Sequence, residues 1–225
     1  RHYVIVDTAG LRRPAKIQEA VERYSVMRTV RAIERSDIVV VVLEATAGVT
    51  EQDRRIAGVG HEAGRGTILA VNKWDVVEKD ERTMAAFTRR IRTELAFLDY
   101  APLIFVSAKQ GKRIPQLIDL VDYVAEQQVR RVQTSHLNEV LSDAVARQEP
   151  PSDKGKALKI FYGTQVGVKP PTFVLFVNDP ELLHFSYQRY LENRLREAYG
   201  FEGTPLILKA KARGERAAKK GENKA

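Results

Sequence analysis

The sequence predicts an α/β protein with two parts, a partial three-layer α/β domain followed by a small α+β domain. In the first part, short apolar runs alternate with helical patterns, which predicts right-handed βαβ units and a parallel sheet. In the second part, the apolar runs Ala157–Val166 and Thr172–Val177 are too close for a crossover helix and should pair antiparallel. The pattern changes near Gln133, so we predict domains over residues 1–133 and 134–210 and a basic tail over 211–225.

The first part carries four runs typical of buried strands. The run Ile38–Leu43 is continuous and mostly β-branched, as expected of a strand covered on both faces. Thr50 has the side chain of a helix cap and opens the next helix. The predicted strands are Tyr3–Val6, Ile38–Leu43, Thr67–Val71 and Leu103–Val106, and the other predicted helices are about Glu19–Arg35, Asp80–Leu98 and Ile114–Arg131.

The second part reads as α-β-β-α-β. Its predicted elements are a helix over Leu137–Arg147, the two antiparallel strands, a helix over Ser186–Tyr199 and a strand over Pro205–Ala210. Apolar neighbours and strand alternation predict that Tyr162, Phe173 and Phe176 lie in the core. The pattern G-x-x-G at Gly200–Gly203 could clamp RNA, but a helix end followed by a turn explains it better, because Glu202 would repel phosphate.

Three polar loops each follow an apolar run directly: Asp7-Thr8-Ala9-Gly10, Asn72-Lys73-Trp74-Asp75 and Ser107-Ala108-Lys109. Loops at the carboxyl ends of parallel strands converge on one crevice, where open α/β sheets bind ligands. A carboxylate such as Asp75 can accept both adjacent donors of guanine, whereas adenine would present it with a lone pair. Asn72 can reach the base from the side, and the stem of Lys73 can lie along its face.

Composition limits the classes of function. No apolar run approaches the roughly 20 residues that a membrane span needs. The absence of cysteine fits a reducing, cytoplasmic location. The formal net charge is +8, and the segment from Lys209 to Ala225 has seven Lys or Arg against two Glu. Such a tail suits a polyanion such as RNA, and a solvated tail without a partner fits equally well.

The three loops resemble the DxxG, NKxD and SAK elements of P-loop GTPases. The resemblance implies GTP or GDP and Mg²⁺ as ligands, with Asp7 holding the metal through water and the Gly10 amide meeting the γ-phosphate. It also implies that the Ser107–Ala108 backbone closes over the carbonyl edge of guanine. No G-x-x-x-x-G-K-[ST] motif occurs in the sequence. The chain opens on Arg1, so we expect it to start within a nucleotide-binding domain whose phosphate loop and first switch lie upstream.

Longer segments resemble the Der (EngA) family of ribosome-assembly GTPases. They are Asp7–Arg13, Ala47–Asp53, Asn72–Asp75, Leu158–Tyr162, Thr164–Val166, Pro170–Asn178 and Arg189–Asn193. The resemblance implies that this chain holds the second of two tandem G domains and a KH-like domain. It further implies a monomer that hydrolyses GTP in the cytoplasm, away from membranes, and assists assembly of the large ribosomal (50S) subunit through its rRNA.

The resemblance assigns the residues of the GTP site: Asp7, Thr8, Ala9, Gly10, Leu11, Asn72, Lys73, Trp74, Asp75, Ser107, Ala108 and Lys109. Leu11 has no group to orient water, so no catalytic residue is assigned in this chain. The candidates for RNA contact are Lys154, Lys156, Lys159, Lys169 and Arg189. Two alternatives stay open: an Era-like RNA-binding GTPase, and a non-enzymatic RNA-binding module that retains a guanine pocket.

Overall fold

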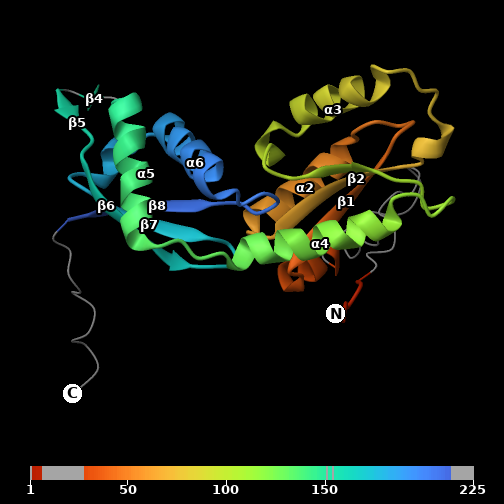
Figure 1. The fold of residues 1–225 in the computed structure, drawn as a ribbon, viewed down its shortest axis with the longest axis horizontal. Helices are drawn as coiled ribbons and strands as arrows, with labels where there is room; N and C mark the ends of the chain where they lie inside the picture. Colours follow the sequence, from red (N-terminus) through yellow and green to blue (C-terminus); the bar gives the residue numbers. More distant parts are fainter. Residues whose placement is uncertain (1, 7–27, 151, 154, 214–225) are drawn as a thin grey trace. The chain divides into compact units, whose positions relative to one another are not determined.

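The computed structural model describes residues 2–6, 28–150, 152–153 and 155–213 (Figure 1). The chain divides into two compact units. The first unit comprises Arg1–Gln128 with Glu202–Pro205, and the second comprises Val129–Phe201 with Leu206–Ala225. The boundary expected near residue 133 and the separate tail stay predictions.

The first unit is built on a parallel sheet with the order β1-β2-β3, as the βαβ pattern predicts. The central strand β2 is buried along its length except at Asn72, its last residue. Residues 28–35 are helical. The named elements are β1 (Ile38–Glu44), α2 (Glu51–Glu62), β2 (Gly66–Asn72), η1 (Trp74–Val76), α3 (Thr83–Glu94), η2 (Ala96–Leu98), β3 (Leu103–Phe105) and α4 (Ile114–Val129).

The segment Tyr3–Val6 is not a strand, so that prediction is wrong. Residues 2–6 have no regular structure, and Val4 and Ile5 are 93% and 84% exposed. Among the described residues, β1 pairs only with β2, and no strand offers the segment a ladder on the other edge. An apolar run needs a hydrogen-bonding neighbour to become a strand. The sequence pattern shows the apolar character but not the neighbour.

The starts of two helices show how side chains fix element boundaries. Thr50 caps α2 in a reciprocal capping box, in which the Asp53 N–H donates to Thr50 Oγ1 at 3.2 Å and the Thr50 N–H donates to Asp53 Oδ2 at 2.9 Å. α3 starts at Thr83 rather than at Asp80 because the Asp80 carboxylate accepts the Thr83 N–H at 2.6 Å. That bond satisfies a first-turn donor, so Asp80 precedes the helix instead of belonging to it.

The second unit has the predicted α-β-β-α-β order. β6 and β7 pair antiparallel, β8 runs parallel to β7, and the sheet order is β6-β7-β8. The elements are α5 (Thr134–Arg147), β6 (Ile160–Gly167), β7 (Thr172–Val177), η3 (Pro180–Leu182), α6 (Phe185–Tyr199) and β8 (Ile207–Ala212). Two short strands that the sequence did not predict, β4 (Ser152–Asp153) and β5 (Lys156–Ala157), form an antiparallel pair.

The strand expected from Ala157 begins only at Ile160. The side-chain amide of Asn178 takes the place of ladder partners there: its Oδ1 accepts the Lys159 N–H at 2.7 Å, and its Nδ2 donates to the Ala157 carbonyl at 3.0 Å. Because these backbone groups are satisfied by a side chain, the chain leaves the ladder before β6.

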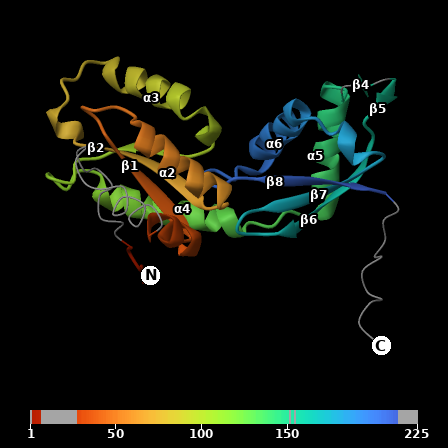
Figure 2. The same cartoon turned by 180° about the vertical axis from the view of Figure 1, so that it is seen from behind.

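The aromatic residues of the second sheet divide between its two faces. Phe173 is fully buried in a core built with residues of α5 and α6. Figures 1 and 2 show these two helices beside the sheet. Tyr162, by contrast, is 43% exposed and stacks on the partly buried Phe176, with ring centroids 4.4 Å apart. The core prediction therefore fails for Tyr162 and Phe176. Side chains along a strand alternate between faces, so Phe173 and Phe176 cannot both point into the same core.

The G-x-x-G pattern is a helix end, as predicted. Gly200 has a φ of 86°, and its N–H donates to the Arg196 carbonyl at 2.8 Å. An Era-like RNA clamp would need this segment to link two helices. Here the segment joins the helix α6 to the strand β8. No feature of this segment favours the Era-like alternative.

Candidate functional site

Two of the three polar loops lie next to each other at the carboxyl ends of neighbouring strands. β2 ends at Asn72, and its Val71 pairs with Phe105, the last residue of β3. The segments that follow, Asn72–Asp75 and Ser107–Lys109, therefore start from the same edge of the sheet. The third loop, together with Leu11, lies outside the described residues.

Backbone and side-chain hydrogen bonds join these two loops. The Ala108 N–H donates to Asn72 Oδ1 at 3.0 Å, and the Trp74 N–H donates to the Val106 carbonyl at 3.1 Å. In this structure the Asn72 side chain therefore orients the Ser107–Lys109 loop. Its contact with the base stays a prediction.

Lys73 and Trp74 have different surroundings. Lys73 adopts a left-handed φ of 60°, and its Nζ lies 2.9 Å from a carboxylate oxygen of Glu44 at the end of β1. Trp74 is 6% exposed and packs against Phe87 and Phe105, with ring centroids 5.1 and 4.3 Å away. Lys73 is therefore at the surface, whereas Trp74 anchors the loop in the core.

The Asp75 carboxylate has surroundings that favour its ionised form. Hydrogen bonding by the Ser107 side chain is the first cause that lowers the pKa of Asp75, and the charges of Lys109 and Lys79 lower it further. Ser107 is 2% exposed, and its Oγ accepts the Gln110 N–H at 3.2 Å, which leaves its hydroxyl proton for Asp75. Asp75 thus stays ionised at neutral pH and can accept two donors.

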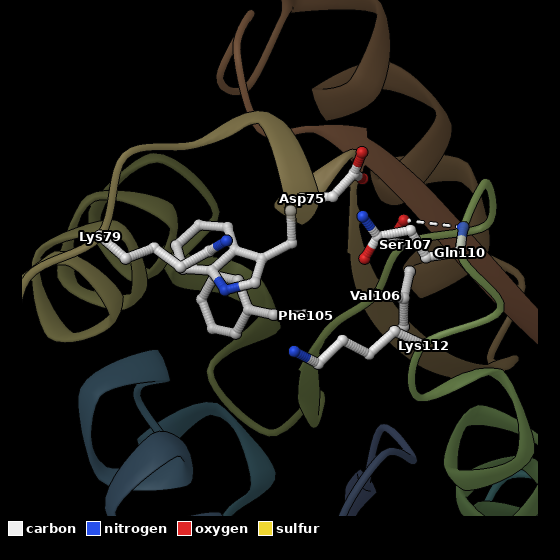
Figure 3. Close-up of a pocket in the computed structure, with 8 residues that line it drawn as sticks. Asp75, Lys79, Phe105, Val106, Ser107, Gln110 and Lys112 are labelled. Carbon is white, nitrogen blue, oxygen red and sulfur yellow. Dashed lines mark hydrogen bonds between the residues drawn. The ribbon is translucent and has the colours of Figure 1, made fainter.

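A small cavity of about 180 Å³ lies beside Asp75 and Ser107 (Figure 3). It is lined by Trp74, Asp75, Lys79, Phe105, Val106, Ser107, Gln110 and Lys112. Asn72, Lys73, Ala108 and Lys109 are absent from that lining. The cavity therefore adjoins the surface that would read a base and is not the whole of it.

The described residues contain no cluster of three or more His, Cys, Asp or Glu that could hold a metal ion. The predicted Mg²⁺ contact, Asp7, falls outside that part of the chain. Within the same described ranges, no helix is both long and apolar enough to cross a membrane.

The candidates for RNA contact come from different elements of the second unit, and their role stays a prediction. Lys156 is on β5, Lys159 precedes β6, Lys169 is in the β6–β7 loop and Arg189 is on α6, while Lys154 is outside the described residues.

The sequence reasoning missed Lys209, Lys211 and Arg213, which it counted only as charge near the tail. Their alternation with Ala210 and Ala212 is a period of two and could have indicated one face of a strand. β8 indeed extends to Ala212, beyond the predicted end at Ala210.

Comparison with known proteins gives two family matches. Residues 131–211 match the KH-domain-like family of EngA bacterial GTPase enzymes, C-terminal, and residues 22–127 match the elongation factor Tu GTP binding domain. GTPase Der of Geobacillus thermodenitrificans is 61% identical over 211 residues, which are 94% of this chain and 48% of that protein. GTPase Der of Desulfitobacterium hafniense is 56% identical over 215 residues, 96% of this chain and 49% of that protein.

The chain thus spans about half the length of the curated relatives it matches. Among solved structures, Era of Aquifex aeolicus bound to GDP and aluminium fluoride has a TM-score of 0.41 at 15% identity, covering 88% of this chain and 73% of that one. A likeness at this level carries no argument about function.

Proposed function

We propose, from the premise that this chain belongs to the Der (EngA) family of GTPases, that its first unit binds the guanine base of GTP or GDP. The whole protein then hydrolyses GTP and assists assembly of the large ribosomal subunit. The observation that carries the base assignment is the hydrogen bond from the Ala108 N–H to Asn72 Oδ1, at 3.0 Å. It joins the two loops at the ends of adjacent strands, beside the Asp75 carboxylate, whose pKa is lowered.

The recognition chemistry follows from the acceptors and donors of this surface. An ionised Asp75 accepts the ring N–H and the exocyclic amine of guanine together. Adenine lacks the ring N–H, so its binding would leave the carboxylate facing a lone pair. The Asn72–Ala108 bond, at 3.0 Å, keeps the loop that covers the base in register with the loop that reads it.

The test is Asp75→Asn in the full-length protein of the parent gene. The substitution replaces one acceptor oxygen by an amide that opposes the donors of guanine, at a cost of about 1–3 kcal/mol of GTP binding. It should also create binding of xanthosine triphosphate, since xanthine has a carbonyl where guanine has the amine. That gain reports on this site even if another guanine site exists elsewhere in the protein, and calorimetry with both nucleotides measures it.

A matched control is Asp80→Asn, in the same segment. Just before α3, Asp80 Oδ1 accepts the N–H groups of Arg82 and Thr83, and the side-chain oxygen of asparagine can accept the same bonds. This variant should keep its preference for GTP. Asp75 does not read the base if Asp75→Asn gains no xanthosine triphosphate binding while remaining folded.

Hydrolysis is proposed for the whole protein and not for this chain alone. The sequence has no G-x-x-x-x-G-K-[ST] loop to neutralise the β- and γ-phosphates, and Leu11 cannot orient water. We propose Asp7 as the residue that holds Mg²⁺ through water, and Mg²⁺ supplies charge neutralisation when it is bound. The purified chain should show no GTP turnover above a buffer blank in a phosphate-release assay, and turnover by the chain would contradict this.

The second unit is proposed to contact ribosomal RNA. Support comes from the match to the KH-like family over residues 131–211 and from the charge of +8. Binding to isolated large subunits should weaken steeply with salt if Lys and Arg contact phosphates. Sedimentation of the chain with these particles across a potassium chloride series tests it. A salt-independent affinity would indicate a protein-facing surface instead.

A further inference from the structure

Among the described residues of the second unit, the helices α5 and α6 pack against one face of its sheet and leave the other face without a helix of this unit. Along β7, Phe173, Leu175 and Val177 are buried and pack into the core with residues of α5 and α6. Val174 and Phe176 alternate with them and therefore point to the opposite side. We call this opposite side of β6, β7 and β8 the open face; Figures 1 and 2 show the strands that form it.

Two rows of side chains cross the open face. Tyr162 of β6 pairs with Phe176 of β7, which pairs in turn with Lys211 of β8. In the next row, Thr164 pairs with Val174, and Val174 with Lys209. Paired residues of adjacent strands share a face about 5 Å apart. Each row therefore ends in a lysine, and the first row places that lysine beside two aromatic rings.

The aromatic pair is built as a stack. The rings of Tyr162 and Phe176 have centroids 4.4 Å apart and an interplanar angle of 17°. Tyr162 is 43% exposed, so much of an aromatic ring remains in contact with solvent. An exposed aromatic ring fixed by a partner is a surface on which a nucleobase can stack.

The charged side chains of these three strands have one sign. Lys209 and Lys211 lie on β8 and Arg213 directly follows it, at alternate positions, and all three are exposed. The guanidinium carbon of Arg213 lies 4.7 Å from the centre of the Phe161 ring, and Lys159 Nζ lies 5.6 Å from the same ring. β6, β7 and β8 contain no Asp or Glu. The combination of rings and unopposed cations matches a single strand of nucleic acid rather than an acidic or apolar protein surface.

We propose that the open face binds single-stranded RNA, with a base stacked on the Tyr162–Phe176 pair and phosphates beside Lys209, Lys211 and Arg213. The site deepens the RNA role of the proposed function, but it depends only on residues of the second unit. Its phosphate contacts, Lys209, Lys211 and Arg213, are not among the candidates named from the sequence. Of those candidates, Lys159 lies near Phe161, whereas Arg189 lies on α6, a helix that packs on the other face of the sheet.

The experiment measures binding of the whole chain to fluorescein-labelled oligoadenylate and oligouridylate by fluorescence anisotropy, with an RNA duplex of equal length for comparison. Stacking is worth about 1–3 kcal/mol per base, so Tyr162→Ala should weaken single-strand binding about 5- to 150-fold. Tyr162→Phe keeps the ring and should bind like the parent chain. Phe185→Ala is the matched control, because Phe185 is an aromatic of the same unit, 77% exposed, at the start of α6.

A second set of variants tests whether the lysines of β8 contact phosphates. Replacing both Lys209 and Lys211 by Gln should reduce the slope of log affinity against log salt by about 1.4 if each meets one phosphate. Arg147→Gln removes one exposed charge from the end of α5 and should leave that slope unchanged. These surface variants preserve the core, so they test the proposal even if Tyr162→Ala lowers the melting temperature.

Three outcomes would overturn the proposal. One is a Tyr162→Ala affinity equal to that of Phe185→Ala. Another is loss of all RNA binding when the chain is cut after Arg213, because the tail alone would then account for the RNA binding. The third is unchanged RNA affinity combined with lost sedimentation with ribosomal particles in Tyr162→Ala, which would make the open face a protein contact. Failure of the parent chain to sediment with the particles at low salt would instead count against the proposed function.

Discussion

The central strands of the two sheets, β2 and β7, are buried in different ways. In β2 every residue before Asn72 is buried, whereas in β7 buried and partly exposed residues alternate. A sheet that is covered on both faces has only the ends of its strands available for a ligand. A sheet that is covered on one face can bind along the whole of the other. The two units therefore place their candidate sites at different parts of a sheet.

The sequence shows the same contrast. The run Thr67–Val71 is continuously apolar and is followed at once by the polar loop of the candidate base site. β8 alternates lysine with alanine, which is typical of a strand with a solvated face. A motif search finds the first kind of site because its residues are contiguous in sequence. It passes over the second kind because its residues come from three strands.

The largest expected effect compares two phenylalanines three positions apart on β7. Phe173 is fully buried in the core, so Phe173→Ala should lower the free energy of unfolding of the second unit by about 3–5 kcal/mol. Phe176 lies on the open face, and Phe176→Ala should cost about 0.5–1.5 kcal/mol, the worth of an aromatic pair. Urea denaturation followed by circular dichroism measures both.

The first unit provides the control for this comparison. Hydrogen exchange of β1 and β2 amides should be unchanged in either variant, because both substitutions lie in the second unit. Equal losses of stability for Phe173→Ala and Phe176→Ala would mean that the open face is part of a core, and the contrast between the sheets would fail.

Much of the fold could be predicted because it depends on local patterns. The runs Ile38–Leu43 and Thr172–Val177 became strands, and Thr50 caps its helix, because these elements are encoded by neighbouring residues. The prediction failed where distant partners decide. Residues 2–6 lack a neighbouring strand among the described residues, and Tyr162 has its face set by pairing with Phe176.

The sequence indicates which segments form the candidate base site, but it does not indicate how their residues contact one another. The polar segments Asn72–Asp75 and Ser107–Lys109 stand out after apolar runs, and the structure brings them together. The buried position of Trp74 and the bond from Ala108 to Asn72 depend on how β2 and β3 end side by side. Spacing along the chain carries no information on these contacts.

The next largest effect is a loss of stability of the second unit at high pH. Burial, followed by the nearby Tyr190, raises the pKa of Tyr187 to about 12. A raised folded-state pKa means that the stabilisation is complete below the unfolded value of 10.0 and is lost as the pH rises from there to about 12. The second unit of Tyr187→Phe should therefore lose less stability over this range than the parent protein. Denaturation at successive pH values measures the difference, and parallel curves for the two proteins would contradict it.

A smaller effect is expected at the start of α2 in the first unit. Thr50→Ala removes the side chain that accepts the Asp53 N–H at 3.2 Å, and it should cost about 0.5–2 kcal/mol of unfolding free energy. Thr50→Ser keeps the hydroxyl and should be close to neutral. Amide exchange in α2 should accelerate in Thr50→Ala, while exchange in α5 should not change. An α5 that loosens equally would show that the two units unfold together.

The smallest effect concerns Asp75 and appears only in acid. Its pKa is lowered first by the Ser107 hydrogen bond, so the ionised acceptor is present above the unfolded value near 3.8 and is lost as the pH falls through the lower folded value. Ser107→Ala removes that bond, so the pKa of Asp75 should rise back toward 3.8. Base affinity at neutral pH then changes little through ionisation, whereas at pH below 4 the variant should lose its acceptor first.

Carboxyl-carbon NMR titration of the two proteins measures this shift directly. Asp80 serves as the internal reference, because its pKa is lowered mainly by the Thr83 side chain and should be the same in both. An Asp75 titration that Ser107→Ala leaves unmoved would show that the carboxylate is not held by the neighbouring loop. The first unit would then have two loops at one sheet edge without the coupling that makes them a site, and its contrast with the open face would rest on burial alone.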